Sequence, residues 1–564
     1  MENEPYKIET RRKYNHIDNK IRLLKKYGDL NTVFNFSDIQ QFVANYQRSS
    51  SDEVLDLVYE NEETELSFEC YIPENVEDVL GYVDPQKPSL VRIHEIDYTE
   101  LMEYTRLDMK SFNNEIESIK TLIIDEEGFE DFDKKVIDQY KVKSLRCEVN
   151  PMTSLKNLDD VKIPISLKLF GDFELHKPVC KTTVSLQFTC VDETVIQDLS
   201  YLHDLEELTI DVIHEKVTDF DVKFPESLKE LRIRCDHEFV YKKSHNQPNV
   251  LRFPKGLKLL VLQNMKIPKD TDLGSSLEEL GLINSTDGLD FPPNLKKGKF
   301  CYYHPSEPQI PHDLEELSLF LKDTSAPDLE KFSNLKKLSI EAGGADPSNI
   351  KLPENLEILV LRDNTNIYTL NDNLIDLAMN APTDSKTLQT KSFPASLKYA
   401  QLTDCDLKWV NDLPSTLEFL EIEGGHSWET EFTFPSGLKA LKLRDKSLGD
   451  ELTLPENLQL FTGFGFNVSQ GFINKLPKGL DILSLSNSPW GDDDTFIFDF
   501  SDYQLTDLEL GFPSSSIEKL ILPGTLKTLS LPNCDLNDLE FLDTSKVTKV
   551  YATFEMEETK VFSN

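Results

Sequence analysis

The sequence predicts an α/β-type solenoid, in which short parallel strands stack along a concave sheet and the return segments form the convex side. Three observations predict it. The pattern L-x-x-L-x-L recurs through most of the chain, the commonest steps between copies are 20 and 21 residues, and a proline-containing phrase such as "FPKGL" or "LPENL" precedes most copies. A period of this length with this leucine spacing is typical of stacked one-strand repeats.

The repeats are numbered from the first leucine of the pattern, so that the leucines occupy positions 1, 4 and 6. Clean copies begin at Leu205, Leu228, Leu257, Leu277, Leu295, Leu314, Leu335, Leu356, Leu374, Leu397, Leu417, Leu438, Leu458, Leu480, Leu505 and Leu526. Weaker copies begin at Ile119, Leu145, Leu167 and Leu186, and a last one begins at Val547. We therefore expect about 20 repeat units over residues 110–564.

Positions 1, 4 and 6 are expected to point into the core, and the positions between them are expected to face outward. One repeat cannot cover its own leucines, so neighbouring repeats must stack. The return path between strands has about the dozen residues that a parallel crossover needs. It rarely shows a helical pattern, so we expect a mostly non-helical convex side of extended or single-turn segments.

Position 2 alternates in charge along the array. The residues there are Lys258, Glu278, Lys296, Glu315, Lys336 and Glu357, and the alternation resumes at Lys398, Glu418 and Lys439. The same position in adjacent repeats lies about 4.8 Å apart. Like charges at that spacing cost about 1 kcal/mol per contact, whereas opposite charges contribute about 0.2–1 kcal/mol. We therefore expect a ladder of ion pairs between repeats rather than a charged docking strip.

Partner-binding residues are sought at the other outward positions, because arginine and aromatic side chains supply most of the energy of protein interfaces. The candidates on predicted strands are Arg232, Arg234, Tyr302, Phe320, Tyr399, Phe419 and Phe464. Two more, Trp490 and Phe498, lie in a long insertion at residues 488–503. A hook that binds a partner and a flap folded onto the convex side are the two interpretations of that insertion.

The charge balance excludes several classes of partner. The chain carries 100 acidic and 60 basic side chains, a formal net charge of −40. Nucleic acid and anionic membrane surfaces both favour a positive protein surface, so we expect neither as a partner.

No signal-like stretch opens the sequence, and no segment approaches 18 uninterrupted apolar residues. Eight cysteines are scattered without a CxxC pair, which predicts a reduced, cytoplasmic protein, with the nucleus as the alternative location.

No pattern favours a catalytic, metal or cofactor site. Cys235, His237 and His245 lie close together in the sequence, but their spacing matches no established metal geometry. The acidic run at residues 492–494 lacks the alternate ligand spacing of an EF-hand loop. Neither a phosphate-binding glycine loop nor an H-E-x-x-H motif occurs. We therefore expect a non-enzymatic chain that binds another protein, with no cofactor and no small-molecule substrate.

Residues 1–50 predict a helical N-terminal segment. Within residues 8–28, Ile17, Ile21 and Leu24 fall on one helical face among basic side chains. Ser37 begins a second predicted helix, with Gln40 in the capping-box position. Helices here would cap the open end of a solenoid, which needs a polar outer cover. Residues 51–109 are expected to form a cap or degenerate repeats.

The repeated phrases "FPESLKELRI", "LPSTLEFLEI" and "LPKGLDILSL" resemble the short leucine-rich-repeat class worded L-P-x-x-L-x-x-L-x-L. That class occurs in some bacterial effectors and in fungal families, including those of Candida-type yeasts. The resemblance covers about four fifths of the chain. It implies a leucine-rich-repeat horseshoe that acts as a scaffold for protein–protein interaction.

A second resemblance lies before the repeats. "YIPENVEDVLGYVD", residues 71–84, is similar to the opening of an F-box, the helical module that attaches receptors to cullin-type ubiquitin ligases. It implies an alternative function, in which the chain is a substrate receptor and residues 37–105 dock the ligase. A decayed repeat is the other interpretation of this stretch, because it also echoes "LPENLEIL".

Overall fold

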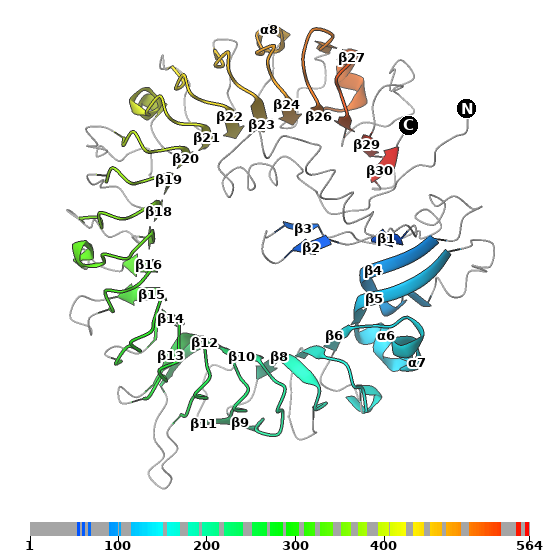
Figure 1. Cartoon of the computed structure of the whole chain (residues 1–564), viewed down its shortest axis with the longest axis vertical. Coiled ribbons are helices and arrows are strands. Elements are labelled where there is room, and N and C mark those ends of the chain that lie inside the picture. The colour runs from blue at the N-terminus through cyan, green and yellow to red at the C-terminus, as the bar shows by residue number, and fades with distance from the viewer. Residues whose placement is uncertain are drawn as a thin grey trace.

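The structure, a computed structural model, is a leucine-rich-repeat solenoid that curves through most of a circle (Figure 1). Its strands line the inner, concave side, and the connecting segments form the convex side. The structure describes residues 54–56, 59–61, 66–68, 89–99, 101–102, 114–149, 155–158, 160–169, 179–190, 194–213, 219–240, 251–267, 271–285, 289–303, 310–321, 328–341, 351–362, 370–380, 393–404, 407–424, 433–444, 452–464, 470–486, 496–531, 549–553 and 559–562.

One long sheet runs through the solenoid, and its neighbouring strands pair in parallel until the last pair, which is antiparallel. The strands before the regular repeats are β1 (Val54–Asp56), β4 (Ser89–Asp97), β5 (Asn114–Ile124), β6 (Ser144–Val149), β7 (Ile165–Leu169) and β8 (Thr183–Cys190). The regular repeats contribute β10 (Glu207–Val212), β12 (Glu230–Val240), β13 (Leu259–Lys266), β14 (Glu279–Ile283), β15 (Lys297–Tyr303), β16 (Glu316–Leu321), β17 (Lys337–Glu341), β18 (Ile358–Arg362) and β19 (Asp376–Asn380). The series continues with β20 (Tyr399–Thr403), β21 (Phe419–Glu423), β22 (Ala440–Arg444), β23 (Leu460–Phe464), β24 (Ile482–Ser486), β26 (Asp507–Gly511), β28 (Thr528–Leu531), β29 (Lys549–Thr553) and β30 (Thr559–Phe562).

The convex side is mostly non-helical, as the sequence predicts. It includes the short α-helices α6 (Glu126–Glu130), α7 (Lys135–Gln139) and α8 (Gln470–Asn474). Short 3₁₀ turns cover Leu155–Leu158, Leu329–Lys331, Leu407–Asp412 and Ser514–Ser516. Two small parallel sheets add to this side, β9 (Thr194–Asp198) with β11 (Asp219–Lys223) and β25 (Phe496–Asp499) with β27 (Ile517–Ile521).

The N-terminal predictions fall largely on residues that the structure does not describe. Residues 1–50, with the predicted helices, and residues 71–84, with the F-box-like stretch, lie outside the described residues. The described parts of residues 51–109 include β1 and β4, which join the long sheet, and an antiparallel pair of β2 (Tyr59–Asn61) and β3 (Leu66–Phe68). Whether this region is a cap or a set of degenerate repeats stays a prediction.

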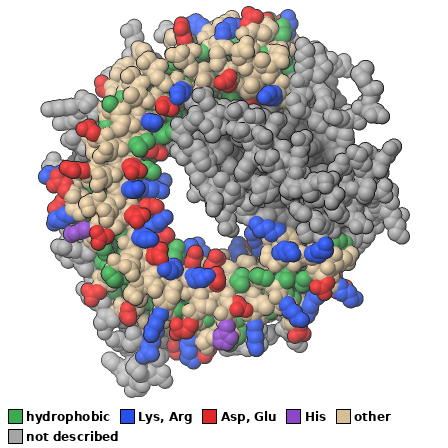
Figure 2. All heavy atoms as spheres, viewed as in Figure 1, with side chains coloured by type: hydrophobic (Ala, Val, Ile, Leu, Met, Phe, Trp, Pro, Cys, Tyr) green, Lys and Arg blue, Asp and Glu red, His purple; other side chains and the backbone are tan. Residues whose placement is uncertain are grey.

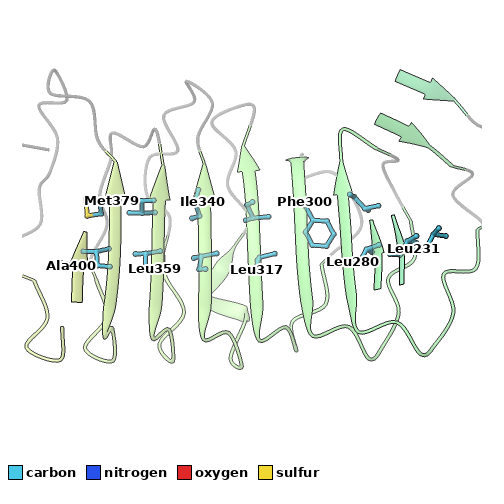
Figure 3. Packing of buried hydrophobic residues seen from close by; sticks show 14 of the residues in the cluster. Leu231, Leu280, Phe300, Leu317, Ile340, Leu359, Met379 and Ala400 are labelled. Atoms are coloured by element: carbon cyan, nitrogen blue, oxygen red, sulfur yellow. The ribbon is translucent and has the colours of Figure 1, made fainter. Parts of the chain in front are cut away.

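The leucines of the pattern form the core, and they do so in rows. Strands β16, β17 and β18 are in register, so that Leu317, Leu338 and Leu359 lie side by side at position 4 (Figure 3). Each of these side chains is at most 1% exposed. The position 6 residues form a second row behind them, and the position 1 leucines form a third. Because each leucine is covered by its equivalents in the next repeats, the core has no centre and extends along the array.

The proline of the repeated phrase sets the entry to each strand. The backbone carbonyl of Pro254 accepts a hydrogen bond of 3.2 Å from the N–H of Leu257, and the carbonyl of Pro414 accepts one of 3.0 Å from Leu417. Each of these bonds closes a β-turn that begins at the proline and ends at the position 1 leucine. In the turn at Pro254, the two central residues, Lys255 and Gly256, are exposed. Proline has no N–H to satisfy and a fixed φ, which suits the extended approach to a turn. The phrase "P-x-x-L" is therefore the turn that delivers each leucine to the core.

The strand ladder begins one residue before each strand. The N–H groups of Glu278 and Glu279 both donate to the carbonyl of Lys258, at 2.8 and 2.9 Å. The N–H groups of Glu357 and Ile358 share the carbonyl of Lys336 in the same way, at 2.9 Å each. Position 2 is thus fixed in register by the backbone, which holds its side chains in a straight row.

The repeat that contains β15 departs from the leucine pattern. Position 4 of β15 is Gly298, and the aromatic ring of Phe300 lies where a side chain at Gly298 would go (Figure 3). A Cβ atom placed on Gly298 would lie 2.5 Å from Phe300 Cε2. The Phe300 ring at position 6 therefore fills the space that a leucine at position 4 would occupy, which explains the glycine at position 298.

We predict that Leu338→Ala lowers the free energy of unfolding by about 2–5 kcal/mol, because the row on both sides cannot close over the space that the side chain leaves. Ser339→Ala is the matched control, since Ser339 is the next residue in β17 and is half-buried on the concave side. Its expected change is within about 0.5 kcal/mol. Urea unfolding followed by circular dichroism measures both. Equal losses for the two variants would contradict the assignment of the leucine row to the core.

Candidate functional site

The concave face is the surface formed by the outward side chains at positions 3, 5 and 7 of the repeats. Figure 2 shows Lys, Arg, Asp and Glu side chains along much of the inner rim of the arc. The burial of these positions divides the face in two. We call strands β10 to β19 the open stretch and strands β20 to β24 the buried stretch.

In the open stretch, buried inward residues alternate with half-buried or exposed outward residues. The burial of Glu316–Leu321 in β16 runs half-buried, buried, half-buried, buried, half-buried, buried. Across β10 to β19 the residues at positions 3, 5 and 7 are half-buried or exposed, with Gly281 the one exception. This alternation is that of a sheet with one face on the core and one face open. The side chains of the open stretch are therefore available for contact.

The charge ladder at position 2 is present. Glu278 contacts Lys258 on one side, and its Oε2 lies 3.6 Å from Lys296 Nζ on the other. Lys258, by its hydrogen bond and its charge, and Lys296 hold the pKa of Glu278 below its usual range. Further along, the Glu418 carboxylate lies 3.2 Å from Lys439 Nζ and 3.9 Å from Lys398 Nζ. The alternation predicted from the sequence is thus neighbour-to-neighbour pairing.

A second ladder, which sequence reasoning missed, runs along position 3 of the open stretch. Glu316 on β16 lies between Lys297 on β15, at 2.9 Å, and Lys337 on β17, at 3.9 Å. The three residues are register partners in the parallel ladder. The sequence could have revealed this ladder, because each of the three residues directly follows the position 2 residue of its repeat and the three alternate in charge in the same way.

The predicted basic spot is on the open stretch, but both arginines are paired. Arg234 donates two hydrogen bonds to the Asp211 carboxylate, from Nε at 2.6 Å and from Nη2 at 3.1 Å. Gln187 donates to the same carboxylate at 2.8 Å. Arg232 Nη1 lies 2.9 Å from Glu230 Oε2 in its own strand. This part of the face is therefore a network of paired charges rather than a cationic patch.

Two aromatic candidates belong to neighbouring strands of the open stretch. Phe320 is half-buried at position 7 of β16 and is the register partner of Cys301 and Glu341. Tyr302 lies in β15 where the register with β16 shifts, and its side chain is outside the described residues. The arginines at β12 and Phe320 at β16 are separated by three strands. The structure therefore does not gather these candidates into one spot.

The prediction that Tyr399 and Phe419 are exposed is wrong. Both occupy position 3 and project from the concave side, yet they are 4% and 0% exposed. They belong to a second buried cluster, separate from the leucine core, with Ala440, Leu460 and Ile482. Burial, with the nearby carboxylates of Glu418 and Asp376, raises the pKa of Tyr399 to about 12. An outward position in a strand is exposed only if nothing lies over the sheet there, and alternation cannot reveal that.

Phe464 stands at the margin of the buried stretch. It is half-buried at position 7 of β23, and the Arg444 guanidinium carbon lies 5.2 Å from the centre of its ring. Arg444 Nη1 also lies 3.6 Å from Glu423 Oε1 on the next strand. An arginine at this distance from an aromatic face makes a favourable cation–π contact. Phe464 is therefore already engaged within the solenoid.

Phe498, a partner-binding candidate in the insertion at residues 488–503, is buried. It is 0% exposed in β25 on the convex side, with the centre of its ring 5.1 Å from that of Phe512 and 6.1 Å from that of Phe500. The side chain of Gln470 in α8 fastens β25 by exchanging two hydrogen bonds of 2.9 Å with the backbone of Ile497. The described part of the insertion is thus the convex flap. Trp490 lies outside the described residues.

The described residues offer little for bond chemistry. Burial raises the pKa of the Cys147 and Cys235 thiols to about 12 and also raises the pKa of Cys301. A thiol is a nucleophile when its pKa is lowered, so these three are not activated. Within the described ranges no group of three or more His, Cys, Asp or Glu side chains is arranged to hold a metal ion.

None of the helices that the structure describes has the length and apolar character that crossing a membrane requires.

We predict that Glu418→Lys destabilises the chain more than Glu418→Gln. The Gln variant loses two ion pairs, which costs up to about 1 kcal/mol each, because the Glu418 side chain is 19% exposed. The Lys variant in addition sets three cations in a row, at about 1 kcal/mol for each repulsive contact. Urea unfolding at low salt and at high salt measures the difference, which should narrow as salt screens the charges. Equal unfolding midpoints at low salt would contradict the pairing.

Comparison with known proteins does not place the chain in a family. No family model matches the chain, and no curated protein matches it. Among solved structures, YopM from Yersinia enterocolitica WA-314 is 16% identical, with 78% of this chain and 79% of that chain covered and a TM-score of 0.30. An internalin (InlF) from Listeria monocytogenes str. 4b F2365 is 14% identical, with 63% of this chain and 82% of that chain covered and a TM-score of 0.20. A leucine-rich repeat protein from Bacteroides ovatus ATCC 8483 is 12% identical, with 83% of this chain and 92% of that chain covered and a TM-score of 0.15. The solenoid fold follows from the chain's own parallel strands and buried leucine rows, and the fungal resemblance stays a prediction.

Proposed function

We propose that this chain is a scaffold that binds another protein along the open stretch of its concave face. The observation that carries the proposal is the composition of that stretch, where half-buried apolar side chains lie among paired charges. Leu259 and Val261 on β13, Phe320 on β16, and Ile358 and Val360 on β18 are all half-buried on this face. Protein interfaces combine apolar contacts that lose water with a polar rim.

The geometry of the fold supports the same function. A solenoid offers a long curved surface whose rows of side chains are held in register by the backbone. The strands keep the outward residues at fixed spacings, so little conformational entropy is lost when a partner binds. A surface of this kind favours an extended contact with a macromolecule over the enclosed pocket that a small molecule needs.

The electrostatics favour a protein over a nucleic acid. Lys297 and Lys337 are paired with Glu316, and Arg234 is paired with Asp211. Binding to a phosphate backbone needs basic side chains that are free to replace counterions. The chain as a whole has a net charge of −40. A protein with mixed charges matches this face better.

The remaining parts of the proposal rest on the sequence. They are that the chain is non-enzymatic, that it acts inside the cell, in the cytoplasm or the nucleus, and that it belongs with the fungal families it resembles. The substrate-receptor alternative depends on residues 71–84, which lie outside the described residues. No structural observation favours that alternative over a scaffold.

The test is an affinity purification of the full chain, with and without two substitutions in the open stretch, Phe320→Asp and Val360→Asp. Both side chains are half-buried and outward, so the variant is expected to keep the fold. We predict that proteins captured by the unmodified chain are recovered at least about tenfold less by this variant, because interface energy is concentrated in such apolar contacts. Quantitative mass spectrometry of the captured proteins measures the ratio.

The matched control carries the same kind of change elsewhere. Ile213→Asp and Ile497→Asp replace two isoleucines that are 44% and 41% exposed and lie off the outward positions of the open stretch. The control should capture the same proteins as the unmodified chain. If the two variants capture equal amounts, the open stretch is not the binding surface.

A further inference from the structure

The buried stretch has an apolar row on the side of the sheet that faces away from the leucine core. Tyr399, Phe419, Ala440, Leu460 and Ile482 occupy position 3 of five consecutive strands and are register partners. Their exposed fractions are 4%, 0%, 0%, 0% and 1%. They make up a buried cluster of their own, apart from the leucine core. At position 3 of these strands the concave side of the sheet is therefore buried as well as the core side.

The open stretch provides an internal control for this burial. Leu259 and Ile358 occupy the same position 3 in the same parallel sheet, and both are only half-buried. Their counterparts Leu460 and Ile482 are 0% and 1% exposed. Neighbouring strands lie about 4.8 Å apart in both stretches, so side-by-side packing within the row cannot account for the difference. A further segment must lie across the concave side of β20 to β24.

The polar residues beside the row are buried as well. At position 5, Glu421 and Lys442 form an ion pair of 3.3 Å with side chains that are 11% and 7% exposed. Thr462 and Ser484 occupy position 5 of the next two strands and are 0% and 1% exposed. Neither hydroxyl has a hydrogen-bond partner. A buried hydroxyl without a partner costs free energy. Whatever lies over this surface therefore meets it mainly through apolar contact.

We propose that residues 8–28 of the chain dock on the buried stretch. This segment places Ile17, Ile21 and Leu24 on one helical face, which matches an apolar row. A helix of this length spans about 30 Å, and five strands span about 19 Å. The segment thus suffices to cross the whole row.

Charge points to the same occupant. Residues 8–28 carry seven Lys or Arg side chains and two acidic ones, a net charge of +5 in a chain of −40. Directly after Ile482 the position 3 row becomes acidic, because its register partner in β26 is Asp507. Glu509 is at position 5 of the same strand. Asp507 is 3% exposed. A helix with apolar residues on one side and basic residues around it satisfies both the apolar row and its acidic end.

The docking has a consequence for the rest of the molecule. It closes the β20–β24 part of the concave face to partners and leaves the open stretch as the accessible part. It also replaces the expectation that residues 8–28 cap the end of the solenoid. The proposal does not depend on any partner, because both surfaces belong to one chain.

Photocrosslinking of the full chain tests the contact directly. A diazirine amino acid in place of Leu460 is activated by light, and the crosslinked peptides are identified by mass spectrometry. We expect crosslinks to peptides within residues 8–28. The same amino acid in place of Leu443, which is 0% exposed in the leucine core, is the positive control and should crosslink to neighbouring repeats. Crosslinks from position 460 to other segments only, or none when the control succeeds, would overturn the proposal.

A second measurement uses the reactivity of a thiol in the row. Ala440→Cys introduces a small buried thiol, whose rate of alkylation reports how often the row opens. Adding Ile17→Asp and Ile21→Asp should raise that rate by at least about tenfold, since both charges would enter the contact. Asn15→Asp with Asn19→Asp adds the same charge on the opposite helical face and should leave the rate within about twofold. Equal rates in the two variants would overturn the proposal, whatever the outcome of the partner capture.

Discussion

The hydrogen-bonded register between neighbouring strands is the constraint on which the rest of the structure depends. It starts at position 2, where one carbonyl accepts two N–H groups from the next repeat, as Lys258 does from Glu278 and Glu279. Since every strand is aligned with the next, each position of the repeat becomes a continuous row along the arc. The burial and the charge of the side chains are therefore set separately for each row. Leucine rows build the core, and the outward rows decide what the concave face can bind.

The rows also explain why one face has two characters. Position 3 is mixed in the open stretch, where Glu279, Lys297 and Glu316 share the row with Leu259 and Ile358, and it is wholly apolar from Tyr399 to Ile482. A charged row beside water is stabilised by alternating signs, whereas an apolar row is stable only when something covers it. The change of composition along one row thus marks where the chain stops presenting a surface for a partner and, in our proposal, begins to contact its own N-terminal segment.

The sequence predicted what depends on local spacing. It placed the strands, the inward leucines and the charge ladder, because each follows from a pattern within one or two repeats. It failed where burial depends on distant parts of the chain. Tyr399 and Phe419 were expected to be exposed and Phe498 was expected to bind a partner, yet all three are buried. The apolar run at position 3 was a readable signal for the first two, but only comparison across five repeats reveals it.

The register itself can be tested by engineered disulfides in the full chain. Ser339 and Val360 are aligned partners on β17 and β18. Aligned residues of parallel strands lie about 4.8 Å apart, within the Cα–Cα range of a disulfide. Ser339 and Arg362 are offset by two residues and lie about 8 Å apart, beyond that range. Under mild oxidation, Ser339→Cys with Val360→Cys should form the bond, and Ser339→Cys with Arg362→Cys should not. Equal bond formation in both pairs would contradict the in-register rows on which this account depends.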